Sequence, residues 1–295
     1  MSTAARLLAF AAVVAVVFGA AAAVGSAVGP IEVGSGSAGH GSHTGGSGAG
    51  AMPRGLAIAQ DGYRLAVDTT HIAADTPSTF GFAIVDEHDA PITTFDELHE
   101  RALHLIVLSR NMVDYFHLHP AMDAAGHWTV DMPALAPGSY RVFADFQPTG
   151  AANLTLGTDV SVPGGVQSVE LPAPDTVATV DEYTVTMSGA PLVGDTELSF
   201  TVELHGQNVR TEPYLGAAGH LVAIRSGDLA YLHVHPHAGD SPVVTFTGEF
   251  PTAGTYRLFF DFSHDGIVRT AAFTVAVGDQ MLDHTSTMAA HEEGR

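Results

Sequence analysis

Two histidine pairs of the form His-x-His are the residues in this sequence best suited to do chemistry. His117 and His119 form the first pair, and His233 and His235 form the second. Residues two apart in a β-strand point to the same face, with Cα atoms about 7 Å apart. Two imidazoles placed in this way can bind one transition-metal ion together. Each pair therefore predicts part of a metal site, provided that it lies on a strand.

A third histidine and an aspartate accompany each pair. His104 and His220 each lie 13 residues before the first histidine of a pair. If they begin strands that form hairpins with the His-x-His strands, their side chains approach the pairs. Asp145 and Asp261 could add a fourth ligand or accept a hydrogen bond from a ligand. The predicted ligands, in two sites or one shared site, are His104, His117, His119, Asp145, His220, His233, His235 and Asp261.

These residues also allow other interpretations. The histidines could be fold residues that hydrogen-bond to loop backbone, or they could form a contact that senses pH, because imidazole titrates near neutrality. Each aspartate could instead pair with the arginine four residues before it, Arg141 or Arg257, because a buried carboxylate needs a cationic or hydrogen-bonding partner.

The composition limits the chemistry. The sequence has no cysteine, which excludes disulfides, thiolate zinc sites and a cysteine nucleophile. Imidazole ligands suit copper, or another transition metal such as zinc. No Ser-His-Asp order, nucleotide-binding loop or metalloprotease helix motif is present, so we expect no enzymatic activity. The net charge of −21 argues against nucleic acid and anionic partners and favours cations.

The elements that must position these histidines come in two copies. His233 follows His117 by 116 residues, and the same offset relates His104 to His220 and Asp145 to Asp261. We therefore expect two copies of one domain, at residues 55–163 and 175–278. Copies of about 100 residues are large enough for separate cores.

Short apolar or alternating runs bounded by Gly, Pro and Asp predict about seven strands in each copy and no helix, as in an antiparallel β-sandwich. The predicted strands of the first copy are Tyr63–Asp68, Thr79–Val85, Leu103–Ser109, Tyr115–His119, Trp128–Asp131, Tyr140–Phe146 and Leu154–Val162. Those of the second copy are Tyr183–Met187, Glu197–Leu204, His220–Ile224, Leu229–His235, Val243–Phe250, Tyr256–Phe262 and Val268–Val277.

Tyr140 and Tyr256 each follow a turn and begin a strand, as in the tyrosine corner of immunoglobulin-like domains. The fold class is therefore predicted to be all-β, with two tandem immunoglobulin-like β-sandwiches. In the His-x-His strands the aliphatic neighbours should face the core, which leaves the histidines facing outward or into a groove between the domains.

The N-terminal region predicts export, and the C-terminal tail adds possible metal ligands. Residues 1–31 contain an apolar stretch, from Leu7 to about Val24, that fits either a signal peptide or an uncleaved membrane anchor. Residues 32–54 are rich in Gly and Ser, with His40 and His43, and predict a flexible tether. The tail at residues 279–295 contains two methionines and two histidines, a composition that suits copper if the tail is ordered.

Several motifs resemble those of a family of exported actinobacterial proteins. They are Leu103-His104-Leu105-Ile106-Val107-Leu108, Phe116-His117-Leu118-His119-Pro120 and Tyr140-Arg141-Val142-Phe143-Ala144-Asp145-Phe146, with their counterparts in the second copy. Members are mostly uncharacterised, and some are labelled secreted or heavy-metal-binding. A broader similarity is to periplasmic β-sandwiches of the copper-resistance type, although the mature N-terminal histidine of those copper sites has no counterpart here.

Together these observations predict an exported protein, tethered to the cell membrane and facing outside or secreted if the N-terminal segment is cleaved. It would bind a transition metal, with copper as the preferred ion, for buffering, storage or delivery. The alternative is a cell-surface structural or interaction module whose histidines are fold residues.

Overall fold

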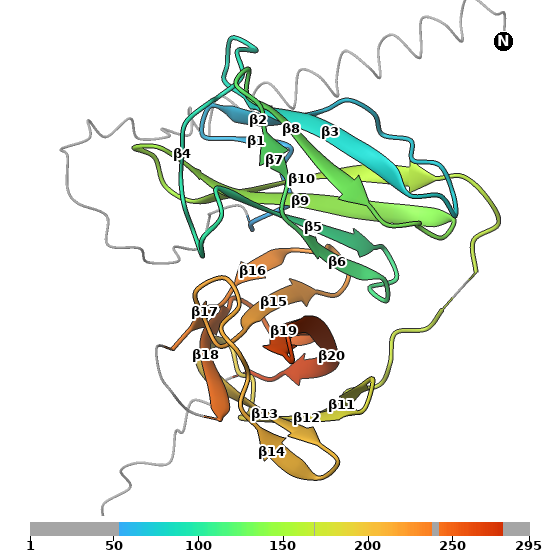
Figure 1. Ribbon diagram of the computed structural model, residues 1–295, viewed down its shortest axis with the longest axis vertical. Helices are drawn as coiled ribbons and strands as arrows, with labels where there is room; N and C mark the ends of the chain where they lie inside the picture. The colour runs from blue at the N-terminus through green and yellow to red at the C-terminus, as the bar shows by residue number, and fades with distance from the viewer. Residues whose placement is uncertain (1–52, 168, 238–241, 280–295) are drawn as a thin grey trace, which may run out of the picture. The chain divides into compact units, whose positions relative to one another are not determined.

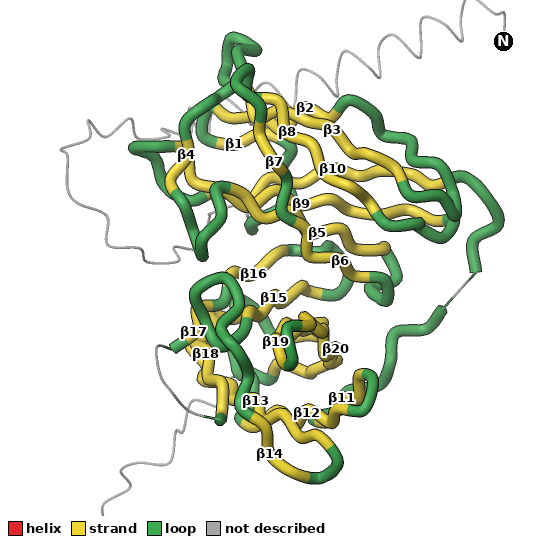
Figure 2. The backbone as a smooth tube through the Cα atoms, in the orientation of Figure 1, coloured by secondary structure: helices red, strands yellow, loops and turns green. Residues whose placement is uncertain are grey.

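Two β-sandwiches make up the part of the chain that the computed structural model describes, which comprises residues 53–167, 169–237 and 242–279 (Figure 1). Within these ranges the chain consists of strands joined by loops, without an α-helix (Figure 2). The described residues include no helix long and apolar enough to cross a membrane. The predicted signal peptide or anchor, most of the tether and nearly all of the tail lie outside them.

The first repeat has ten strands in two sheets. One sheet has the order β1-β2-β3-β8-β7, and the other has the order β10-β9-β5-β6, with β4 paired to β9. The strands are β1 (Ala59–Gln60), β2 (Tyr63–Val67), β3 (Ser78–Val85), β4 (Phe95–Asp96), β5 (Leu103–Ser109), β6 (Tyr115–Leu118), β7 (Ala121–Met122), β8 (His127–Met132), β9 (Gly138–Pro148) and β10 (Leu154–Val162).

The second repeat follows the same plan. Its sheets have the orders β11-β12-β13-β18-β17, with β14 paired to β13, and β16-β15-β19-β20. The strands are β11 (Val177–Val180), β12 (Tyr183–Ser188), β13 (Gly194–Leu204), β14 (Gln207–Val209), β15 (His220–Arg225), β16 (Tyr231–His233), β17 (His235–Pro236), β18 (Val243–Phe250), β19 (Gly254–His264) and β20 (Ile267–Val277).

The strand order is that of an immunoglobulin-like domain. When β2, β3, β5, β6, β7, β8, β9 and β10 are lettered A, B, C, C′, D, E, F and G, the sheets read ABED and GFCC′. The strands of the second repeat have the same order in their two sheets. Tyr140 and Tyr256, each near the start of strand F, donate to the carbonyl oxygens of Ala136 and Thr252, at 3.0 and 2.9 Å. The predicted fold class and both tyrosine corners are confirmed.

Strand β5 is buried on both faces, which accounts for its continuous apolar run. Leu105 and Val107 point into the core of the first sandwich. Ile106 and Leu108 point the other way and join a separate apolar cluster that contains residues of both repeats. We call this shared surface the inter-repeat face. Its buried members are Ile106, Leu108, Met112, Phe143, Val222, Ile224, Leu229, Tyr231 and Phe259.

The two repeats contribute equivalent residues to the inter-repeat face. The ring of Tyr115 stacks on that of Phe259, with centroids 4.1 Å apart, and the ring of Tyr231 lies 5.5 Å from that of Phe143. Tyr115 and Tyr231 occupy equivalent positions in the two repeats, and so do Phe143 and Phe259, because each pair is separated by 116 residues. The contacts are therefore related by approximate two-fold symmetry.

The predicted strand Leu229–His235 is wrong in one respect, because it is divided between two sheets. Tyr231–His233 forms β16 and pairs with β15, whereas His235–Pro236 forms β17 and pairs with β18. Val234 lies between these strands and packs into the core of the second sandwich. In the first repeat β6 likewise ends at Leu118, so His119 lies just beyond the strand.

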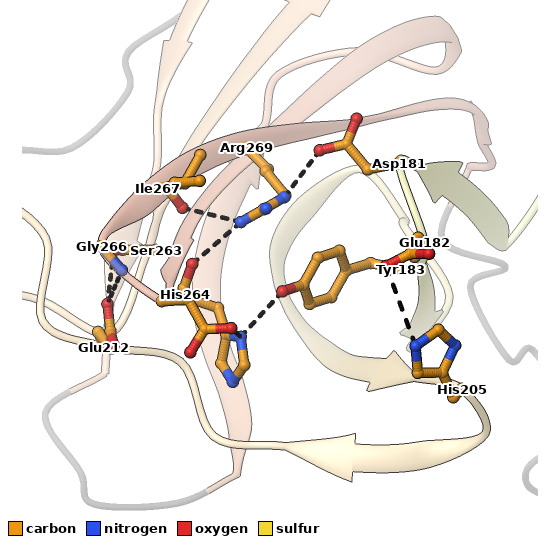
Figure 3. Close-up of polar contacts among 11 residues, drawn as sticks. Asp181, Glu182, Tyr183, His205, Glu212, Ser263, His264, Gly266, Ile267 and Arg269 are labelled. Atoms are coloured by element: carbon orange, nitrogen blue, oxygen red, sulfur yellow. Dashed lines mark hydrogen bonds and ion pairs between the residues drawn. The ribbon is translucent and has the colours of Figure 1, made fainter.

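Polar contacts fix the turn between β19 and β20 at one end of the second sandwich (Figure 3). The Tyr183 hydroxyl lies 2.9 Å from Nδ1 of His264, and Glu212 accepts hydrogen bonds from the Ser263 hydroxyl and the Gly266 amide. Arg269 extends over the ring of Tyr183, 4.5 Å from its centroid. These side chains partner one another, which indicates a structural role.

The tyrosine corners give a test of the fold. Tyr140→Phe and Tyr256→Phe should each lower the free energy of unfolding by about 1 kcal/mol, because each removes the hydroxyl that hydrogen-bonds to the backbone carbonyl of Ala136 or Thr252. Chemical denaturation of the two variants measures this loss. Equal effects in the two repeats would agree with their equivalent corners, and no loss in either would contradict the assigned role.

Candidate functional site

Three histidines of the first repeat come together at one edge of the inter-repeat face. Each of His104, His117 and His119 offers one ring nitrogen, and these nitrogens lie within 4.8 Å of one another. Nitrogens bound to one tetrahedral ion at 2.0–2.1 Å would be roughly 3.3 Å apart. The three residues, which we call the histidine cluster, therefore approach the arrangement that an ion requires.

The β5–β6 hairpin produces this arrangement. Ile106 pairs with His117 and Leu105 with Leu118. His119 follows the end of β6, and its ring lies 5.2 Å from that of His104. Because side chains alternate along a strand, the apolar neighbours of His117, Phe116 and Leu118, pack against the sandwich core and the histidine turns to the inter-repeat face. The hairpin and its direction are as the sequence predicted.

Outer hydrogen bonds orient two of the three rings. Nε2 of His104 lies 2.9 Å from the carbonyl oxygen of Leu98, and Nδ1 of His117 lies 2.8 Å from Oδ2 of Asp261. A carbonyl or carboxylate oxygen accepts, so both of these nitrogens carry hydrogen. The remaining nitrogens, Nδ1 of His104 and Nε2 of His117, face each other at 3.0 Å. Histidine ligands of metal ions are typically held by such outer hydrogen bonds.

Among the described residues, the third ring carries a buried nitrogen that no protein group contacts by a hydrogen bond. Nε2 of His119 makes no hydrogen bond among the described residues. An unsatisfied buried polar atom costs about 1–3 kcal/mol, so a native protein usually supplies it with a partner. The centroid of this ring lies 4.8 Å from that of His117 and 5.2 Å from that of His104. His119 also offers one ring nitrogen to the cluster, within 4.8 Å of those of His104 and His117.

Burial keeps the rings of His104, His119 and His220 neutral. Desolvation, followed by the charge of His117, lowers the pKa of His104 to about 4 and that of His119 to about 3. Desolvation also lowers the pKa of His220 to about 4. Neutral imidazoles keep the lone pair that a metal needs.

The second repeat contributes directly to the cluster's surroundings. His220 is buried, and its ring centroid lies 6.1 Å from that of His117 and 6.3 Å from that of His104. Its Nε2 donates to the carbonyl oxygen of Tyr214 at 3.0 Å, which repeats the bond from His104 to Leu98. The side chains of His233 and His235 lie outside the described residues. The second predicted ligand set, built on His220, therefore stays a prediction.

Both aspartates are buried, and each accepts a hydrogen bond from a tyrosine of the other repeat. Asp145 accepts a hydrogen bond from the hydroxyl of Tyr231 at 3.3 Å, and Asp261 accepts one from the hydroxyl of Tyr115 at the same distance. Asp261 also accepts from Thr270 at 2.6 Å, and it orients His117 rather than reaching the center of the cluster.

The arginines that could have paired with these aspartates make other hydrogen bonds. Arg141 donates to the carbonyl oxygens of Gly55 and Leu56, and Arg257 donates to the carbonyl oxygen of Met112 and the hydroxyl of Thr274. These bonds account for two buried guanidinium groups. Sequence spacing alone could not separate the two interpretations, because an i, i+4 pair in a strand lies on one face in either case.

The sequence offered no indication of the turn that closes over the cluster. His99 and Glu100 both have positive φ, of 50° and 59°. Histidine is among the residue types enriched in this conformation, whereas glutamate is not. The ring of His99 lies 5.1 Å from that of His220 and 6.1 Å from that of His104. A pattern search for Asn-Gly or Asp-Gly turns misses such a pair.

The lowered pKa values predict how stability depends on pH. Below pH 6.5 the unfolded chain binds protons on His104, His119 and His220 that the metal-free folded chain does not bind until about pH 4 or below. Stability is therefore full above pH 6.5 and falls as the pH is lowered toward 4. The loss should reach about 1.4 kcal/mol per pH unit for each of the two more deeply buried rings, His104 and His220.

Urea denaturation in the presence of a chelator, at several pH values, measures this slope. His220→Gln should make it shallower. His88→Ala, which changes an exposed histidine outside the cluster, should leave it unchanged. A free energy of unfolding that stays constant between pH 6.5 and 4.5 would contradict the prediction.

Comparisons with known proteins give a family. Residues 58–163 and 178–279 match one family model, described as Domain of unknown function (DUF8832). No curated protein matches the chain. The solved structures similar to it include FdeC, an Escherichia coli adhesin, at 17% identity over 75% of this chain and 66% of that chain, with a TM-score of 0.26. InvD of Yersinia pseudotuberculosis is 14% identical over 77% of this chain and 60% of that chain, with a TM-score of 0.25.

The chain thus spans less than two thirds of each of these two structures. The family match is of a different kind, because it covers both sandwiches and more than half of the sequence. The chain belongs to the DUF8832 family and carries the family's domain twice.

Proposed function

We propose that this protein is an exported pair of immunoglobulin-like domains that binds a transition-metal ion through His104, His117 and His119, for buffering, storage or delivery. The observation that carries the proposal is the direction of the ring nitrogens. Two rings are held from outside by Leu98 and Asp261, while nitrogens of all three rings converge. Outer hydrogen bonds of this kind fix the tautomer that presents a lone pair to a metal.

Copper is the preferred ion and zinc the second choice. Imidazole nitrogens suit both, and for a given set of ligands Cu(II) binds more tightly than Zn(II). Calcium and magnesium prefer oxygen ligands, and the clustered ligand atoms here are nitrogens. Three protein ligands leave a position for water or for a donor from another molecule. An open position suits a protein that takes up and releases its ion.

The location outside the cell membrane belongs to the same proposal. It rests on the apolar segment at residues 1–31 and the Gly/Ser-rich stretch that follows it. The net charge of −21 would also raise the local concentration of cations near the protein.

A second candidate function is a cell-surface structural or interaction module. It is favoured by the equivalent bonds from His104 and His220 to backbone carbonyl oxygens, which would serve the fold without any metal. The immunoglobulin-like fold is also common among surface modules, including those that act only through protein contacts.

Metal titration separates the two functions. The purified protein should bind one Cu(II) or Zn(II) ion at the cluster, and His117→Ala/His119→Ala should weaken that binding by more than roughly 100-fold, since loss of an outer partner alone costs 10–100-fold. His127→Ala is the matched control, because His127 also pairs with an aspartate, Asp68, at 2.9 Å but lies outside the cluster. Isothermal titration calorimetry gives the affinities.

The structural module predicts a different result for the same variants. His117→Ala/His119→Ala would then lower thermal stability and leave metal binding as it is in the unchanged protein. Metal binding that survives this double substitution would rule out the proposed site.

The hydrogen bonds that link Leu98, His104, His117 and Asp261 also predict that metal binding releases a proton. Nε2 of His104 and Nδ1 of His117 both donate, so the 3.0 Å contact between their other nitrogens needs one further proton. A metal ion must displace that proton. Calorimetry in two buffers of different ionisation enthalpy should show release of about one proton for each ion bound at neutral pH, and binding should weaken as the pH falls. Release of no proton would mean that the ion binds elsewhere.

A further inference from the structure

Asp261, which orients one of the clustered histidines, does not belong to the repeat that carries them. Its Oδ2 accepts from Nδ1 of His117 at 2.8 Å and from the hydroxyl of Tyr115, and its Oδ1 accepts from Thr270 of its own repeat. Asp261 as a whole is 1% exposed. It is therefore held firmly by the second repeat while it fixes a ring of the first.

Apolar packing accompanies this bond between the repeats. Ile106 and Phe143 of the first repeat share the inter-repeat face with Val222 and Ile224 of the second. His220 begins the strand that carries Val222 and Ile224, and its ring packs near the rings of His104 and His117. Separation of the two repeats would remove both the carboxylate partner of His117 and the buried surroundings of the cluster.

We infer that the metal site is complete only when the two repeats are docked, so that ion binding and docking stabilise each other. This inference rests on the proposed function and adds its regulation. If docking raises the affinity for the ion by some factor, the ion raises the docking equilibrium by the same factor. Loss of an outer partner of a histidine ligand typically weakens metal binding 10–100-fold, which sets the expected size of the effect.

A pair of aspartate variants tests the role of the second repeat in binding. Asp261→Asn should weaken Zn(II) binding by roughly 10–100-fold. Asp68→Asn is the matched control, because Asp68 forms an ordinary aspartate–histidine pair within the first repeat, with His127. It should leave the affinity unchanged. Circular dichroism confirms that both variants are folded.

A third variant tests docking without altering any polar group of the site. Ile224→Ala trims the inter-repeat face at the end of β15 away from His220. The natural chain has no cysteine, so fluorescent labels can be attached at Thr129→Cys and Asn208→Cys, two exposed positions in different repeats. Single-molecule energy transfer then reports docking. Zn(II) is used because, unlike Cu(II), it does not quench the dyes.

The inference predicts that Ile224→Ala broadens the distribution of transfer efficiencies, that Zn(II) restores the docked population, and that His119→Ala abolishes this restoration. Unchanged Zn(II) affinity in both Asp261→Asn and Ile224→Ala would overturn it and leave the proposed function standing. Absence of Zn(II) binding to the unchanged protein would overturn both. If Asp261→Asn does not fold, the affinity of Ile224→Ala decides.

Discussion

Burial of one sheet of each repeat against the other is the constraint on which the rest of this structure depends. It takes the face of β5, β6 and β9 out of water and turns histidines that would be exposed on an isolated domain into desolvated ones. It also accounts for the crossing hydrogen bonds, because a carboxylate buried in such an interface must find its donors there. Tyr115 and Tyr231 supply these donors in a symmetric exchange.

Fold role and ligand role are not opposites in this setting. A histidine has two ring nitrogens, and in His104 one of them is fixed by the carbonyl of Leu98 while the other points into the cluster. The bond that makes this ring part of the fold also selects the tautomer that could bind an ion. His119 differs, because its buried Nε2 lacks a protein partner in the described part of the chain. This difference makes His119 the residue least well explained by the fold alone.

Much of the fold could be predicted from the sequence, because short-range rules govern it. Strand β10 begins and ends where the alternation places it, and the predicted strand Tyr140–Phe146 lies within β9, which begins two residues earlier at Gly138. The hairpin that joins His104 to His117 also follows from strand lengths. What could not be predicted is contact across the repeats. Asp261 and Tyr115, which hydrogen-bond to each other, are 146 residues apart. The periodicity of the sequence does not indicate which faces of two similar sandwiches meet.

The turn over the histidines shows what tandem duplication makes available. In the first repeat it carries His99 and Glu100, whereas the equivalent turn of the second repeat carries Leu215 and Gly216, with positive φ of 52° and 75°. Two identical subunits related by symmetry must present the same residue at both equivalent positions. A duplicated chain escapes this rule, since each copy mutates separately. The turn of the second repeat can therefore keep the same backbone shape with Leu-Gly, while the turn of the first repeat places an imidazole and a carboxylate at the equivalent position. The two repeats thus share one fold but differ in the chemistry of this turn.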